Sequence, residues 1–392
     1  MIERADVIIV GGGIFGLSLA FELQRLQSRK IVVLERRHMG AGASSRNVGR
    51  VRAIQLTPEL ARLSLACQRK HAGLTDELGA STLFWRAGYA LVLYDDDEME
   101  VMAGVDRMLR SEIGLKTELI GSDESIRRMP ILSGGVRPKG ALFHRDAAAH
   151  HDAVLFAYRG ALRRQGVDVR EQTEVIGLLR SGDRIEGVTL KGGRELRAPL
   201  VVNATGAWSS TLSRMAGLAP PNVPLRREAM VTEAVKPLID VLITFYRPTE
   251  GWLNQTLRGE VVMGVVPEHE TPGITLAATP EAAIRTATAV LAKAPRLGQL
   301  RIVRQWAGMY DVTPDRKPTL GPVAARPGFI QMNGDNGRGF LLGPKLGELL
   351  AQWLETGAVP ALIAPFAADR FGENAASLPA STDYYAGYRK KA

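Results

Sequence analysis

The sequence predicts an α/β protein in which a parallel-sheet domain is assembled from discontinuous segments and a strand-rich domain is inserted into it. The chain opens as strand, helix, strand: residues 5–10 and 31–35 are apolar runs, and residues 14–27 between them have helical spacing. Two parallel strands joined by a helix form a right-handed crossover unit. Strands followed by Gly-containing turns return at residues 199–206 and 329–356, so one sheet draws on the beginning, middle and end of the chain.

The inserted part is recognised by a different pattern. Residues 224–310 contain strands with period-two alternation, including 259–265 and 300–310. We therefore expect an antiparallel sheet in a second domain. The predicted bounds are 1–83, 147–222 and 318–392 for the first domain, and 84–146 and 223–317 for the second.

The remaining elements are predicted in chain order from the same periodicities. We expect helices at 59–78, 96–112, 152–165 and 344–356, and strands at 89–93, 167–170, 173–180, 184–190, 195–198, 199–202 and 329–332.

Composition excludes several classes of protein. The 392 residues are 45% hydrophobic and 23% charged, which is typical of a globular chain. The formal charge is +9, but Lys and Arg are scattered rather than clustered, so we expect anionic small substrates or an acidic partner protein and no nucleic acid. Cys67 is the single cysteine, which excludes an internal disulfide, and no metal-binding motif is present, so we predict no metal.

Location follows from two further absences in the sequence. No apolar run reaches the roughly 18–20 residues that a membrane helix needs. The first residues also lack the pattern of a secretory signal. We therefore expect a cytoplasmic protein without a membrane span.

A glycine motif follows the first strand and opens the first helix. Gly11, Gly13 and Gly16 match G-x-G-x-x-G, in which the glycines permit a tight turn, close approach to a pyrophosphate and close helix–strand packing. The helix start offers free N–H groups to phosphates. Glu35, at the end of the second strand, is placed for an adenosine ribose hydroxyl. With this context the motif indicates dinucleotide binding rather than an ordinary Gly-rich turn.

Two further segments favour FAD over NAD. Residues 40–47 (Gly-Ala-Gly-Ala-Ser-Ser-Arg-Asn) let the backbone run against an extended cofactor. Residues 205–208 (Thr-Gly-Ala-Trp), after the strand at 199–202, provide a second contact typical of two-dinucleotide-binding flavoproteins.

With these motifs the whole chain resembles the glycine/D-amino-acid oxidase superfamily of FAD enzymes. Within it the chain most resembles the beta subunit of heterotetrameric sarcosine oxidase and related dehydrogenases of N-methylglutamate, proline, D-hydroxyproline and opines. The resemblance implies a Rossmann-like FAD domain. The matching segments are 40–47, 51–52, 56–59, 149–154, 215–217, 259–264 and 306–308.

The resemblance also implies individual site residues. Arg52 falls where relatives hold the substrate carboxylate, and Arg338 is a second candidate by position. The alternative for Arg52 is a structural salt bridge. The implied FAD contacts are Gly11, Gly13, Ile14, Phe15, Gly16, Glu35, Arg36, Ser44, Ser45, Arg46, Asn47, Val175, Thr205, Gly206, Trp208, Gly337, Arg338, Gly339, Phe340 and Leu341.

Two positions depart from the family pattern. Leu341 stands where relatives often have a carboxylate-binding lysine, and Val262 stands where monomeric relatives have an oxygen-activating lysine. Without a cation at position 262, superoxide or peroxide charge near the flavin would be less well stabilised, so the resemblance does not imply fast oxidase activity. Gly343-Pro344 is expected to open the last helix, since proline is favoured in a first turn, and the positive helix end would face the flavin.

His151 resembles the histidine that carries FMN at the subunit interface of the sarcosine oxidase beta subunit. The resemblance thus implies FMN near His151 and a second, larger subunit of a hetero-oligomer; the alternative is a histidine that simply starts a helix beside Asp152.

The predicted function is FAD-dependent oxidation of a secondary or N-substituted amino acid, by hydride transfer to flavin N5. Two alternatives stay open: a catalytically quiet FAD-binding subunit, and an NAD(P)H-dependent flavoprotein reductase.

Overall fold

The computed structural model describes residues 3–267 and 272–372. A six-stranded sheet has the order β10 (Asp168–Arg170), β3 (Ile31–Leu34), β2 (Val7–Val10), β14 (Leu200–Asn203), β21 (Phe329–Asn333) and β20 (Thr319–Pro322). The first five strands are parallel to their neighbours and β20 is antiparallel. The parallel sheet built from distant segments is therefore confirmed. The chain leaves β2 for β3 on one side and returns to β14 on the other, and ligands bind at such a switch point.

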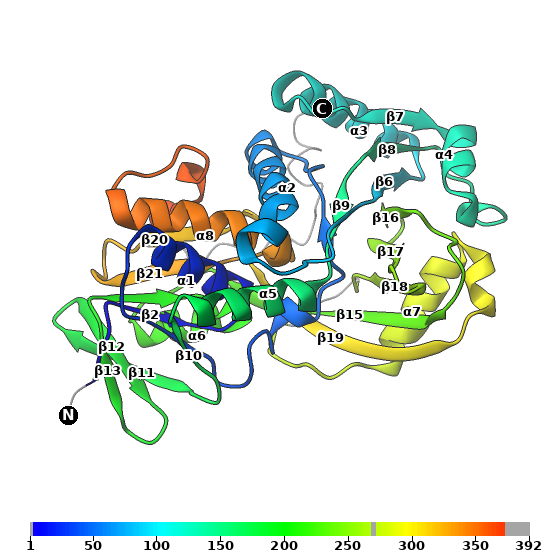
Figure 1. Cartoon of the computed structure of the whole chain (residues 1–392). Helices are drawn as coiled ribbons and strands as arrows, with labels where there is room; N and C mark the ends of the chain where they lie inside the picture. The colour runs from blue at the N-terminus through cyan, green and yellow to red at the C-terminus, as the bar shows by residue number, and fades with distance from the viewer. Residues whose placement is uncertain (1–2, 268–271, 373–392) are drawn as a thin grey trace.

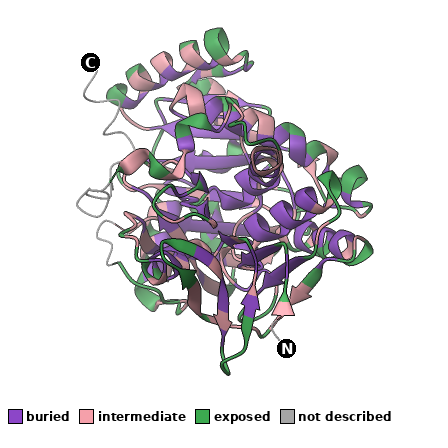
Figure 2. Cartoon of the chain, turned by 90° about the vertical axis from the view of Figure 1, so that its left-hand side faces the viewer, coloured by how far each residue is buried: buried purple, intermediate pink, exposed green. Residues whose placement is uncertain are grey.

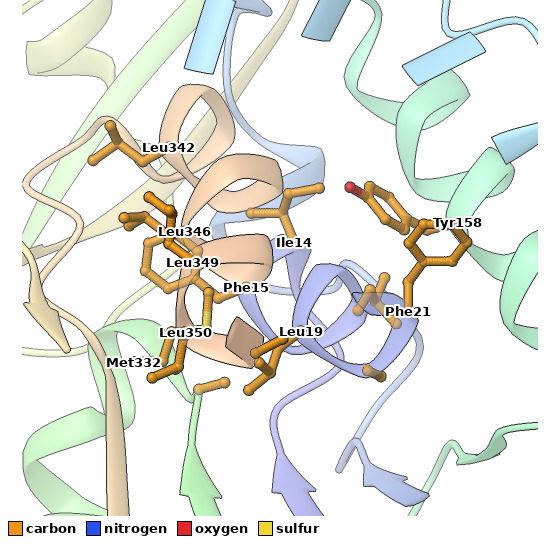
Figure 3. Close-up of a cluster of buried hydrophobic side chains, with 14 of the residues drawn as sticks. Ile14, Phe15, Leu19, Phe21, Tyr158, Met332, Leu342, Leu346, Leu349 and Leu350 are labelled. Carbon is orange, nitrogen blue, oxygen red and sulfur yellow. The ribbon is translucent and has the colours of Figure 1, made fainter. Parts of the chain in front are cut away.

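Both faces of this sheet are covered, and its central strands lie in the buried interior (Figure 2): every residue of β2 and β3 is apolar and buried. Val7 and Ile9 face α1 (Ile14–Leu26), α5 (His151–Arg164) and α8 (Gly339–Thr356). Ile8 and Val10 face a four-stranded sheet. Figure 3 shows Phe15 and Leu19 of α1 beside Leu346 and Leu350 of α8. The four-stranded sheet comprises β1 (Glu3–Arg4), β13 (Glu195–Arg197), β12 (Arg184–Leu190) and β11 (Val175–Ser181).

A second large sheet lies on the other side of the molecule (Figure 1). It is antiparallel except where β6 and β16 pair in parallel, which the purely antiparallel prediction missed. Its order is β19 (Ile302–Val312), β15 (Val223–Ala234), β18 (Glu260–Val265), β17 (Gly251–Gln255), β16 (Val241–Phe245), β6 (Gly88–Leu93), β8 (Gly140–His144) and β7 (Glu118–Gly121).

These strands all come from residues 84–146 and 223–317. The division into two domains with the predicted bounds stays a prediction. A third, three-stranded sheet joins β4 (Arg50–Val51), β9 (Ala147–Ala148) and β5 (Trp85–Arg86).

The remaining helices are placed as follows. α2 (Pro58–Leu78) packs on α8, and α7 (Pro280–Leu291), in a region predicted only as strands, packs against β17 and β18. Thr279 caps α7 by accepting a hydrogen bond from the Ala282 N–H at 3.3 Å. The others are α3 (Asp96–Met108), α4 (Ser122–Arg128) and α6 (Ser209–Met215). No helix in residues 3–267 and 272–372 has the length and apolarity that crossing a membrane requires.

The last helix begins earlier than predicted. α8 starts at Gly339, so Pro344 lies inside the helix and not in its first turn. The prediction that Gly343-Pro344 opens the helix is wrong. The positive end of α8 is therefore at Gly339–Leu341.

Candidate active site

A cavity of about 450 Å³ runs from the carboxyl ends of β2 and β14 to the eight-stranded sheet. This volume lies within the usual range for small-molecule sites. Most predicted FAD contacts line it: Gly11, Gly13, Ile14, Phe15, Glu35, Arg36, Ser44, Arg46, Asn47, Val175, Thr205, Gly206, Trp208, Gly337, Arg338, Gly339, Phe340 and Leu341. Their roles in binding stay predictions.

The glycine turn has no room for side chains. Gly11 has φ +114°, and a Cβ there would lie 2.3 Å from the Ala204 carbonyl oxygen. At Gly16 a Cβ would lie 2.0 Å from the Gly11 carbonyl oxygen, so this glycine serves helix–strand packing and does not line the cavity. The turn between β2 and α1 thus brings bare backbone to the cavity wall.

Ser44 completes the start of α1. Its Oγ accepts a hydrogen bond from the Ile14 N–H at 2.9 Å, because the N-cap residue Gly13 has no side chain. A hydroxyl that accepts one bond can still donate its own proton. Ser44 therefore keeps a donor for a ligand at the α1 end of the cavity. Ser45 does not line the cavity; its Oγ donates to the Gly40 carbonyl at 2.8 Å.

Glu35 is fixed at the end of β3 by backbone donors. Its Oε2 accepts from the Gly12 N–H at 3.0 Å and its Oε1 from the Arg37 N–H at 2.9 Å. Carboxylate oxygens have further lone pairs, so Glu35 can also accept from a ribose hydroxyl. Arg36 beside it lies 4.2 Å from the ring centroid of Trp208, a cation–π contact that joins the β3 and β14 ends of the site.

The two predicted carboxylate ligands both line the cavity. Arg52 Nη1 donates to the Tyr89 hydroxyl at 3.1 Å and is 3.5 Å from the Ile54 carbonyl oxygen. Arg338 Nη1 donates to the Arg316 carbonyl at 2.8 Å. Both guanidinium groups are therefore oriented by hydrogen bonds to neighbouring protein groups.

Sequence reasoning missed several residues of this end of the cavity. Arg50, Arg227, Tyr246, Trp252 and Tyr310 also line it. The guanidinium of Arg227 lies 4.8 Å from the Tyr310 ring centroid. A signal for Arg50 existed, since residues i and i+2 of an extended strand face the same side and Arg52 had been recognised. The others come from strands whose pairing was not predicted.

Leu341 lines the cavity in the first turn of α8, where N–H groups have no partner within the helix. Pro344 has no N–H for the Phe340 carbonyl, and His71 of α2 takes its place: Nε2 lies 3.0 Å from that oxygen and 3.2 Å from the Leu341 oxygen. Burial lowers the pKa of His71 to about 4. The imidazole is thus neutral, and Nε2 carries its proton.

Two buried carboxyl groups stand behind the α8 end of the cavity. Asp311 Oδ2 accepts from the Ser209 hydroxyl at 2.9 Å, Asn222 Nδ2 at 3.0 Å and the Gly334 N–H at 2.7 Å. The Asp311 N–H in turn donates to Oδ1 of Asp335, which lines the cavity, at 3.4 Å. Burial and the neighbouring Asp335 raise the pKa of Asp311 to about 7, and burial raises the pKa of Asp335 to about 6.

These raised pKa values predict pH-dependent stability. The unfolded chain ionises both groups near pH 4, whereas the folded protein retains their protons to about pH 6–7. Stability from this source is therefore complete below pH 4 and is lost as pH rises to 7. We expect Asp311→Asn to melt about 2–4 °C above the unsubstituted protein at pH 8, the shift for roughly 1 kcal/mol, and to lose this advantage at pH 5. An equal difference at both pH values would contradict the assignment.

His151 does not line the cavity. It begins α5, its Nε2 lies 3.5 Å from Asp152 Oδ1, and its ring stacks on His150 with 5.1 Å between centroids. Burial lowers its pKa, and nearby Arg258 and Arg304 act in the same direction. The helix-start alternative thus describes its contacts, and the FMN role stays a prediction.

Comparison with known proteins gives consistent results. A family model described as FAD dependent oxidoreductase (DAO) matches residues 6–353. The chain is 29% identical over 381 residues to sarcosine oxidase subunit beta of Rhodobacter capsulatus, covering 95% of this chain and 89% of that protein. It is also 29% identical to hydrogen cyanide synthase subunit HcnC of Pseudomonas aeruginosa, with 95% and 98% covered. The structure of L-proline dehydrogenase from P. horikoshii superposes with a TM-score of 0.87 at 27% identity, covering 95% of this chain and 98% of that one.

Proposed function

The chain belongs to the DAO family of FAD-dependent oxidoreductases and its cofactor is FAD; from this premise we propose that it oxidises a secondary or N-substituted amino acid. Bound FAD would supply the two-electron acceptor: the carbon next to nitrogen would give up a hydride to flavin N5 and the amine a proton, and the resulting imine would be released or hydrolysed. The observation that carries the proposal is one continuous cavity, in which the dinucleotide-binding turn and a chamber containing Arg52 meet.

The residues of the cavity fit FAD. The turn has to be bare backbone, since a Cβ would lie 2.3 Å from the Ala204 carbonyl oxygen at Gly11 and 3.0 Å from Ser44 Oγ at Gly13. Ser44, the start of α1 and Glu35 are placed for the phosphates and a ribose. When bound, FAD supplies the redox chemistry, and the protein supplies orientation and electrostatics.

The protein's own part is to bind, orient and exclude water. Arg52, whose Nη1 donates to the Tyr89 hydroxyl, binds the substrate carboxylate with its guanidinium. Tyr246 and Trp252 enclose the chamber with aromatic surface, and burial favours the neutral amine that can lose hydride. The N–H groups at the start of α8 present positive charge to the cavity, and they would stabilise negative charge on a reduced flavin bound beside them.

Anaerobic reduction tests the proposal. Purified protein should be yellow and should bleach with an amine from a screen of sarcosine, proline, hydroxyproline, N-methylglutamate and opines. Reduction by NADH alone would instead support the reductase alternative. Absence of reduction by every amine and by NADH would support a quiet subunit.

Arg52→Ala should weaken substrate binding much more than FAD binding. Loss of a charged hydrogen bond in a desolvated site costs about 1.5–3 kcal/mol, roughly a ten- to hundredfold rise in the dissociation constant. Titration of the flavin spectrum with substrate measures this effect, and FAD stoichiometry serves as the control. Unchanged substrate affinity would remove Arg52 from the binding site.

The proposal extends to a partner. Two relatives are subunits by name, and we propose that this chain works in a hetero-oligomer with FMN near His151. The cofactors of the co-purified complex should include FAD and FMN, and His151→Ala should lose FMN alone. Full activity of the lone chain with FAD only would contradict this. A cytoplasmic location also stays a prediction.

A further inference from the structure

Arg50 is a half-buried cation that has no acidic partner among the described residues. Its Nε lies 3.3 Å from Asn254 Oδ1, its Nη1 donates to Thr244 Oγ1 at 2.7 Å, and its Nη2 donates to the Ile243 and Leu253 carbonyls at 2.8 and 3.1 Å. All four acceptors are neutral. In the described parts of the chain no carboxylate lies within 4 Å of this guanidinium; one Nη1 proton has no acceptor there.

The guanidinium stays charged although its surroundings disfavour it. Burial lowers the pKa of Arg50 to about 10, and the positive charge of Arg52 acts in the same direction. At neutral pH the group is still protonated. Removing a charge from water without an opposite charge beside it costs free energy. Because Arg50 lines the cavity, an anion bound there would offset that cost.

The position of Arg50 suggests which anion. Arg50 and Arg52 flank Val51, which is fully buried, and both line the same cavity. Their Cα atoms are about 7 Å apart along an extended chain. Arg50 is held by β16 and β17 of the eight-stranded sheet, whereas Arg52 is held by Tyr89 of β6. Two guanidinium groups, each held by different strands of the eight-stranded sheet, therefore line one cavity.

We infer that Arg50 binds a second carboxylate, so that the substrate is a secondary amine carrying two carboxylate groups. The inference rests on the proposed function and narrows its substrate class. Arg52 holds the carboxylate of the amino-acid end, and Arg50 holds the carboxylate on the N-substituent or side chain. The second carboxylate accepts a hydrogen bond from the Nη1 proton of Arg50 that has no acceptor among the described residues, and it pairs with the charge of the guanidinium.

Binding of unreactive acids to the FAD-containing protein tests the inference without turnover. Butyrate and succinate have equal length and differ in one carboxylate, so the perturbation of the flavin spectrum by each measures the second contact. Succinate or its longer homologue glutarate should bind at least about tenfold more tightly than butyrate, the lower bound for one charged hydrogen bond. A protein without preference for the diacids overturns the inference.

Variants locate the contact. Arg50→Gln should weaken diacid binding by about ten- to a hundredfold and butyrate binding by less than threefold, whereas Arg52→Gln should weaken both. The FAD content and melting temperature of Arg50→Gln are measured first, to show that this variant folds. If it does not fold, Arg50→Lys takes its place; this variant keeps the charge and should keep part of the preference for diacids.

Two other results have definite meanings. Equal weakening of butyrate and succinate in Arg50→Gln, together with a shifted FAD midpoint potential, would assign Arg50 to the flavin and overturn the inference. If diacid preference depends on Arg50 but no amine reduces the FAD, the proposed function fails and the anion site stands.

Discussion

Gly11→Ala is expected to yield a colourless protein that retains no FAD. The new Cβ would lie 2.3 Å from the Ala204 carbonyl oxygen, so β2 and β14 would have to separate at their carboxyl ends. An alanine at φ +114° also costs about 1–2 kcal/mol in backbone strain, and forced overpacking costs about 1–3 kcal/mol. The displaced turn is the wall that approaches the cofactor. Absorbance at 450 nm after purification measures the loss.

A second glycine separates the effect of backbone strain at positive φ from the effect of the steric clash with Ala204. Gly192 has φ +91° with nothing within 4 Å of a Cβ, and it lies in the β12–β13 turn. Gly192→Ala should lose only the free energy of backbone strain at positive φ, and the protein should keep its full FAD content and yellow colour. Full FAD content in Gly11→Ala would show that the turn tolerates the shift and would contradict our interpretation of the glycine motif.

The parallel sheet and its dinucleotide-type turn could be predicted because their signals are local. The turn at Gly11, the helix that follows and the acidic residue at 35 lie within one strand–helix–strand unit, and each requirement is met by neighbours in sequence. The strands of the second sheet were also detectable by alternation. Their pairing was not, because β6 and β16 meet in parallel across about 150 residues of chain, and periodicity does not specify partners.

Features of the site could not be predicted where they depend on contacts with another element that is distant in the sequence. Pro344 indicated a helix start, but in the structure His71 of α2 satisfies the carbonyl that the proline leaves free. Arg50 carried no motif; its role depends on acceptors from β16 and β17 that the sequence did not bring together. Such contacts between distant segments decide both where α8 begins and which charges line the cavity.

Lys70→Met should be among the most destabilising single substitutions in the helices α1, α2 and α8. Lys70 of α2 is 8% exposed, and its Nζ pairs with Glu22 of α1 at 2.8 Å, with Glu348 of α8 at 3.0 Å and with Glu77. Without the ammonium, the fully buried Glu22 keeps only Arg25, whose side chain is half exposed. Removing one partner of a buried ion pair costs about 3–5 kcal/mol. Urea unfolding followed by far-UV circular dichroism measures this loss.

The burial of Glu22 makes a sharp comparison possible within the same cluster. Glu77 is one-third exposed, so Glu77→Gln should cost less than about 1 kcal/mol, as surface pairs do. Lys70→Met combined with Glu22→Leu removes both buried charges, and replacing a buried pair by apolar residues is often nearly neutral; the double variant should therefore recover most of the loss. If Lys70→Met alone cost under 1 kcal/mol, or if Glu22→Leu gave no recovery, the uncompensated carboxylate could not be the cause, and the three helices would be held by their apolar contacts alone.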